Sequence, residues 1–83
     1  MELEEKIENL IGPTVEKAGY ELLEVKIGFQ KRNQILTLII GKAGGLSVED
    51  CARVSRLVEP ILDGSDLIKG RYLLTVSSPG IKE

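Results

Sequence analysis

The spacing of the apolar residues changes three times along this 83-residue chain, and the order of the changes limits the folds it can adopt. Apolar residues recur at helical spacing first, then alternate through two segments, then recur helically and finally alternate again. Helical spacing is typical of an amphipathic helix, and alternation is typical of a strand with one buried face. The sequence therefore predicts the order α-β-β-α-β in one domain over residues 1–83, without an internal repeat.

The first helix is predicted from one apolar stripe, which consists of Leu3, Ile7, Leu10, Ile11, Val15 and Ala18. Gly12-Pro13 interrupts this segment, and proline both removes a backbone donor and clashes with the preceding turn. Because the apolar stripe keeps its phase across the proline, one kinked helix is favoured over two helices. Gly19 stands where a left-handed C-cap is expected.

The two alternating segments that follow predict a β-hairpin, joined by the polar residues 30–34. The inward residues of its first strand are expected to be Leu23, Val25, Ile27 and Phe29. The return strand is expected to bury Leu36, Leu38 and Ile40 and to place Ile35, Thr37 and Ile39 outward. Apolar residues on both faces indicate a strand that is covered on its outer face by a second domain or a partner.

A second helix is predicted after a glycine-rich turn, with Ser47 as its N-cap and Asp50 as the capping-box acid. Its buried stripe is expected to be Val48, Cys51, Val54, Val58, Ile61 and Leu62. Pro60 is expected to bend or fray the last turn, and residues 63–66 to end the helix.

The last strand, residues 72–77, alternates Tyr72, Leu74 and Val76 inward against three outward residues. A strand–helix–strand crossover is right-handed and parallel, so this strand should run parallel to the second one. The predicted fold class is α+β, a two-layer α/β sandwich with both helices on one face of a three-stranded mixed sheet. Periodicity leaves the strand order open.

Composition argues against catalysis. The chain has no histidine and one cysteine, Cys51, which removes the usual general base, the commonest metal ligand and any intrachain disulfide. Cys51 is expected to be a small buried hydrophobe. The N-terminus is acidic, unlike a signal peptide, and no apolar run approaches the ~20 residues that span a bilayer. We therefore expect a cytoplasmic, non-catalytic domain without a cofactor or metal, and without a membrane or small-molecule partner.

The net charge of −2 argues mildly against tight autonomous binding to a phosphate backbone. The candidate contact residues are the basic side chains Lys26, Lys31, Arg32, Lys42, Arg53 and Arg56. For these residues a solvated surface and an electrostatic anchor both remain open. Residues 41–44 match the Gly-x-x-Gly pattern of loops that clamp nucleic-acid backbones. A plain loop is favoured there, because Glu49 and Asp50 already occupy the positive end of the following helix.

The last strand runs into Ser77, Ser78, Pro79 and Gly80. Proline fixes one φ and glycine permits a positive one, so the pair aims the outgoing chain in one direction. The serine hydroxyls can cap the loose amides of such a turn.

Taken together, these segments resemble the N-terminal domain of the ribosome maturation factor RimP family. The resemblance rests on residues 19–22, 45–51, 54–56 and 62–63, and on Tyr72-Leu73 leading to the run from Val76 to Gly80. The chain departs from the family pattern at Gly41, where an aspartate is usual, and at Thr75, where a glutamate is usual.

The resemblance implies a non-enzymatic assembly factor that joins immature small ribosomal subunits and helps them mature. Its implied partners are small-subunit rRNA and small-subunit ribosomal protein twelve. The family's second domain, a small β-barrel, is missing, so the chain is interpreted as a fragment, and residues 77–80 are assigned to interdomain geometry. An alternative from another class is a protein-interaction or dimerisation module that uses the apolar outer sheet face.

Overall fold

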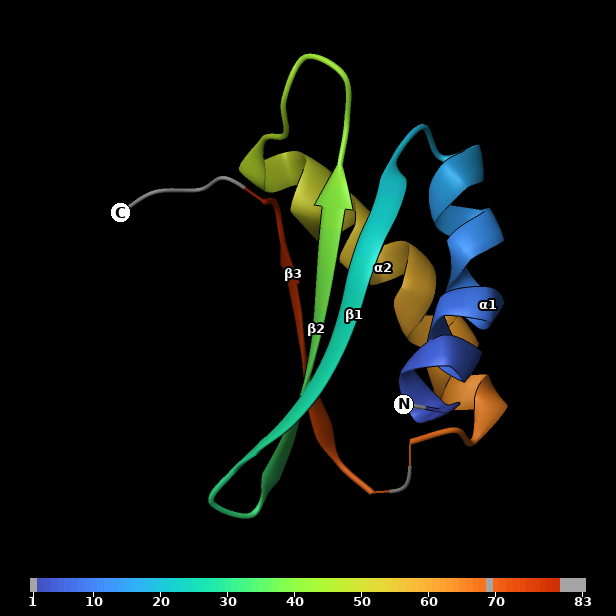
Figure 1. Cartoon of the computed structure of the whole chain (residues 1–83), viewed down its shortest axis with the longest axis vertical. Helices are drawn as coiled ribbons and strands as arrows, with labels where there is room; N and C mark the ends of the chain where they lie inside the picture. The colour runs from blue at the N-terminus through green and yellow to red at the C-terminus, as the bar shows by residue number, and fades with distance from the viewer. Residues whose placement is uncertain (1, 69, 80–83) are drawn as a thin grey trace.

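The computed structural model describes residues 2–68 and 70–79, which form two helices and a three-stranded sheet (Figure 1). In chain order the elements are α1 (Glu2–Lys17), β1 (Glu21–Gln30), β2 (Asn33–Gly41), α2 (Val48–Ser65) and β3 (Tyr72–Ser77). The predicted element order and the α+β class are both confirmed.

The strand order is β1-β2-β3, so β2 is the central strand. It pairs antiparallel with β1 through the hairpin and parallel with β3 through the α2 crossover. A hairpin needs only a short turn, whereas a parallel pair needs a long connection, and the chain supplies one of each. The structure thus decides the strand order that periodicity left open.

Both helices pack against the same face of the sheet (Figure 1). Helix α1 lies against β1, α2 lies against β3, and the two helices contact each other. The core between the layers consists of Ile7, Ile11, Val15, Tyr20, Val25, Leu36, Leu38, Ile40, Val54, Val58 and Leu62. The predicted inward set of β2 is confirmed.

Proline ends neither helix. Pro13 lies inside α1, which is continuous from Glu2 to Lys17, and the exposed Pro60 lies inside α2, which continues to Ser65. Of the bend or fraying expected at Pro60, the fraying is wrong, because α2 stays helical to Ser65. Packing of each helix on the sheet outweighs the one hydrogen bond that each proline removes.

Helix α1 ends in a Schellman motif, as Gly19 predicts. Gly19 has a φ of +98°, the Tyr20 N–H donates to the Val15 carbonyl at 3.1 Å, and the Gly19 N–H donates to the Glu16 carbonyl at 3.0 Å. These bonds satisfy carbonyls at the end of the helix and turn the chain directly into β1. Tyr20 is thereby placed in the core at the point where β1 begins.

Two expected inward residues of β1 are exposed instead. A β-bulge shifts the register between Leu22, opposite Ile40, and Glu24, opposite Ile39. Because of the bulge, Leu22 packs on the core and Leu23 is 45% exposed. Phe29 keeps the inward phase but is 74% exposed, since the hairpin extends past the lower ends of the helices (Figure 1).

The helical stripes are also narrower than predicted. Leu10 lies at the edge of the α1 stripe and is exposed, and Val48 is 87% exposed at the first position of α2. Cys51 is half-buried and free rather than fully buried. The buried positions of α2 are Val54, Val58 and Leu62, which all follow its first turn.

We expect Leu38→Ala to lower the free energy of unfolding by about 2–5 kcal/mol, because Leu38 is fully buried in the central strand. Leu73→Ala, at a 59% exposed position of β3, is the matched control and should change it much less. Urea denaturation measures both. Equal losses would show that β2 is not the centre of the core.

Candidate functional site

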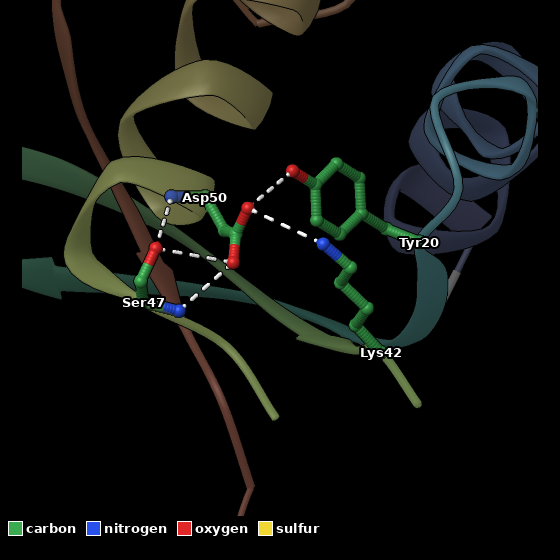
Figure 2. Close-up of polar contacts among 4 residues, drawn as sticks. All are labelled: Tyr20, Lys42, Ser47 and Asp50. Carbon is green, nitrogen blue, oxygen red and sulfur yellow. Dashed lines mark hydrogen bonds and ion pairs between the residues drawn. The ribbon is translucent and has the colours of Figure 1, made fainter. Parts of the chain in front are cut away.

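Four side chains from three separate segments meet at one end of the sheet (Figure 2). Tyr20 precedes β1, Lys42 begins the loop after β2, and Ser47 and Asp50 form the N-terminus of α2. The phenol hydroxyl of Tyr20 donates to Asp50 Oδ1 at 2.7 Å. Lys42 Nζ lies 3.7 Å from the same oxygen and 5.4 Å from the centre of the Tyr20 ring. We call these four residues the Asp50 cluster.

Ser47 and Asp50 form the predicted capping box. Asp50 Oδ2 accepts from the Ser47 backbone N–H at 2.9 Å and from the Ser47 hydroxyl at 3.1 Å. The Ser47 hydroxyl in turn accepts from the Asp50 N–H at 3.2 Å. The orphan amides at the start of α2 are therefore satisfied within the chain.

The hydrogen bonds of this cluster explain its pKa shifts. The Ser47 backbone N–H, followed by the Tyr20 hydroxyl, lowers the pKa of Asp50 from 3.8 to about 2. The same Tyr20–Asp50 bond raises the pKa of Tyr20. Asp50 is therefore ionised at neutral pH, where it accepts hydrogen bonds and does not transfer protons. Its role in the fold is to tie α2 to the junction between α1 and β1.

The glycine-rich loop of residues 41–45 leads into this cluster. Gly44 and Gly45 have φ values of +89° and +99°, and the Gly45 N–H donates to the Lys42 carbonyl at 3.0 Å. The Lys42 side chain points back to Asp50 (Figure 2). This geometry fits a plain loop into a capped helix, because Ser47 and the Asp50 carboxylate take the place that a bound phosphate would need.

The opposite end of the sheet is exposed and basic. We call residues 28–35 together with Arg71 the hairpin end. Its two-residue turn is Lys31-Arg32, and Lys31 adopts the left-handed region with a φ of 56°. Lys31, Arg32 and Arg71 are all exposed. Figure 1 shows this turn at the bottom of the view, beyond both helices.

Parallel pairing of β3 with β2 brings Arg71 to this end. Gln34 lies opposite Tyr72 in the register, and Gln34 Nε2 donates to the Arg71 carbonyl in a long contact of 3.4 Å. The Tyr72 hydroxyl donates to Asp63 of α2 at 3.2 Å, and burial, followed by that bond, raises the pKa of Tyr72 to about 12. Arg71 is thus positioned by a strand that is anchored to both the sheet and α2.

The charge of the chain is unevenly distributed. Residues 25–46 contain four basic side chains and no acidic one, whereas the rest of the chain contains seven basic and thirteen acidic side chains. Three of those four basic residues, Lys26, Lys31 and Arg32, lie on the hairpin. The hairpin turn and the strand residues beside it are therefore the basic part of an acidic domain.

The six candidate contact residues do not form one patch. Lys26 lies on the outer sheet face opposite Thr37, and Lys42 lies at the far end of β2 from Lys31. The nine residues of β2 span about 26 Å between these ends. Arg53 and Arg56 are exposed on α2, and the charge of Arg53 acts on the Tyr20 hydroxyl.

Arg71 and Phe29 are the residues of the hairpin end that sequence reasoning missed. The sequence shows that residue 71 is an arginine, but only the strand order shows that Arg71 lies at the same end of the sheet as the hairpin turn. The inward phase of Phe29 predicts a core position, which the structure does not bear out. In the sequence, the exposure of Phe29 could have been predicted only from the length of the hairpin strands relative to the helices that cover them.

The predicted turn is described only in part. Ser77 is the last residue of β3, Ser78 is half-buried and Pro79 is exposed, while Gly80 lies outside the described residues. Among residues 2–68 and 70–79, no group of three or more Asp, Glu, Cys or His side chains could hold a metal ion. In the same residues, neither helix is long and apolar enough to span a membrane.

We expect Asp50→Asn to be less stable than the wild type at pH 7, with a gap that closes as the pH falls from about 4 to about 2. The lowered pKa means that the ionised carboxylate stabilises the fold above its unfolded pKa and loses this effect on protonation. Urea denaturation at a series of pH values measures the gap. Glu49→Gln, an exposed neighbour, is the control and should show a much smaller gap. A gap for Asp50→Asn that does not change with pH would contradict the assignment.

Comparison with protein families gives one match on this fold. The family model described as the RimP N-terminal domain matches residues 10–82, which run from the middle of α1 past the end of β3. The match covers most of the chain and includes the second half of α1, the hairpin, α2, β3 and the Asp50 cluster. The chain therefore belongs to the family of the N-terminal domain of the ribosome maturation factor RimP.

Proposed function

We propose that this chain is a non-enzymatic domain that helps the small ribosomal subunit to mature in the cytoplasm. Its proposed partners are small-subunit rRNA and small-subunit ribosomal protein twelve. Family membership supports a role in ribosome maturation. The observation that carries RNA binding is the hairpin end, where Lys31, Arg32 and Arg71 project from an otherwise acidic domain.

Electrostatics favour this end as the surface that meets rRNA. Exposed lysine and arginine side chains neutralise phosphates and release their counterions, which makes binding strong at low salt. The thirteen acidic residues, all outside residues 25–46, disfavour approach of RNA from other sides. The domain would therefore bind RNA in one orientation, with the hairpin first.

The other basic candidates have different surroundings. Lys42 is partly neutralised by Asp50 at 3.7 Å, so we rank it below the hairpin residues. Arg53 and Arg56 share the exposed side of α2 and are proposed as a second contact area, on protein or RNA. Lys26 lies on the outer face of the sheet, opposite Thr37 and away from the helices.

The turn at residues 77–80 is proposed to set the geometry between this domain and a following β-barrel domain. Ser77 ends β3 and the exposed Pro79 follows two residues later, so the turn is attached directly to a paired strand. A proline with a fixed φ next to a rigid strand restricts the direction in which the chain leaves.

A second candidate function is self-association through the outer sheet face. The helices cover only the other face, which leaves Leu23 and Leu73 exposed and Ile35 and Ile39 half-buried. Light scattering after size-exclusion chromatography tests this candidate. A mass of twice 9.1 kDa that Leu73→Asp reduces to 9.1 kDa would support it.

We expect the double variant Lys31→Ala/Arg32→Ala to bind salt-washed immature small subunits more weakly in co-sedimentation. The slope of log K against log salt should fall by about one for each phosphate that the variant no longer neutralises. The matched control is Lys6→Ala/Lys17→Ala, which removes the same charge from exposed positions of α1. Unchanged binding of the hairpin variant would mean that the tip is only a solvated turn.

A further inference from the structure

We propose that Phe29 stacks on an unpaired RNA base while Lys31, Arg32 and Arg71 contact the flanking phosphates. This inference rests on the proposed function, because it names the kind of RNA that the hairpin end recognises. It assigns a role to the one phenylalanine of the chain, which contributes nothing to the core.

The exposure of Phe29 is the first observation. Its side chain is 74% exposed on β1, opposite Gln34. The end of the hairpin extends beyond both helices (Figure 1). A single exposed apolar residue is common and needs no explanation by itself. Phe29 differs from the exposed Val48 because it presents a flat aromatic ring two residues before the basic turn.

Spacing is the second observation. Phe29 is the last residue but one of β1, and Lys31 is the first residue of the turn that follows β1. Lysine and arginine side chains on the turn can reach phosphates next to a base that lies on the ring. Arg71, directly before β3, adds a third cation at this end of the sheet: Gln34 of the central strand lies opposite Phe29 and donates to the Arg71 backbone carbonyl.

The polar residues of the hairpin end complete the site. Gln30 and Asn33 are exposed on either side of the turn and pair across the hairpin. Their side-chain amides carry both donors and acceptors, which suit the edges of an unstacked base. A ring for stacking, amides for base edges and cations for phosphates are the groups that single-stranded RNA readers combine.

Charge favours RNA over protein as the occupant. No acidic residue occurs between Val25 and Leu46, so no carboxylate on the hairpin turn or beside it in the chain repels phosphate. An aromatic anchor for a protein pocket is usually surrounded by contacts that exclude water. Phe29 instead lies between the exposed Gly28 and Gln30 and opposite Gln34, and the exposed cations Lys31 and Arg32 follow it in the turn. Single strands and loops are favoured over duplexes, because only an unpaired base can present its face to the ring.

The direct test uses Phe29→Trp, because the chain has no other tryptophan to obscure the signal. The variant is titrated with an adenine-rich RNA of about twelve nucleotides, and with the same strand annealed to its complement. We expect strong quenching of the tryptophan fluorescence by the single strand and much less by the duplex. Binding of the single strand without quenching would overturn the stacking role.

Affinity variants separate the ring from the cations. Phe29→Ala should weaken binding of the single strand by about 5- to 100-fold, while leaving the salt slope unchanged. Phe29→Tyr should retain the affinity and Phe29→Leu should lose it, since stacking needs an aromatic face. Lys31→Ala/Arg32→Ala should lower the salt slope by about 0.7 for each phosphate left without its cation. Val48→Ala, an exposed apolar position at the far end of the molecule, is the control and should bind like the wild type.

The same variants are measured with immature small subunits, so that the two proposals can fail separately. If the Lys31→Ala/Arg32→Ala change weakens subunit binding but Phe29→Ala does not, the proposed function stands and the stacking is wrong. If Phe29→Leu binds subunits as well as the wild type while Phe29→Ala does not, the ring is an apolar anchor for a protein. If subunits do not bind but the single strand quenches the fluorescence of the Phe29→Trp variant, the stacking stands and the proposed function fails. Thermal unfolding of each variant should match the wild type, because Phe29 is outside the core.

Discussion

Burial of the inner face of β2 beneath both helices is the interaction on which the rest of the structure depends. Leu36, Leu38 and Ile40 are almost completely buried, and β2 pairs with a strand on each side. A chain of this size buries only about 60–65% of the surface of its unfolded form, so one well-packed layer must supply most of the stability. The register of both neighbouring strands follows from keeping these three side chains inside.

The two ends of β2 have different characters, and the difference follows from the helices. At the Gly41 end, the N-terminus of α2 lies close enough for Asp50 to reach Tyr20 and Lys42. That end is held by hydrogen bonds that join three segments. At the Asn33 end, the hairpin extends past both helices (Figure 1), and residues 28–33 are exposed. The contacts at the Gly41 end join α2 to the rest of the fold, and the exposed Asn33 end is the surface that we propose for binding.

This division suits a domain that binds a large, highly charged partner. In the proposed binding mode, a basic projection on an acidic body would limit RNA contact to a small area and orient the domain there. The Asp50 cluster keeps its charges paired within the chain, so it adds little to attraction for RNA. Family membership supports a role in ribosome maturation, and the charge distribution is a separate observation that supports the proposed RNA contact.

The sequence by itself determined the order of the elements, the hairpin, the inward face of β2 and the Ser47 cap. Each of these features depends on the spacing of a few neighbouring residues, because the periods of helices and strands and the capping box are local. The tertiary structure alone decided what depends on distant segments. The bulge turns Leu23 outward, the short helices leave Phe29 uncovered, and parallel pairing brings Arg71 beside the hairpin. Tyr20 and Asp50 are thirty residues apart, so their hydrogen bond exists only once the helices have packed on the sheet.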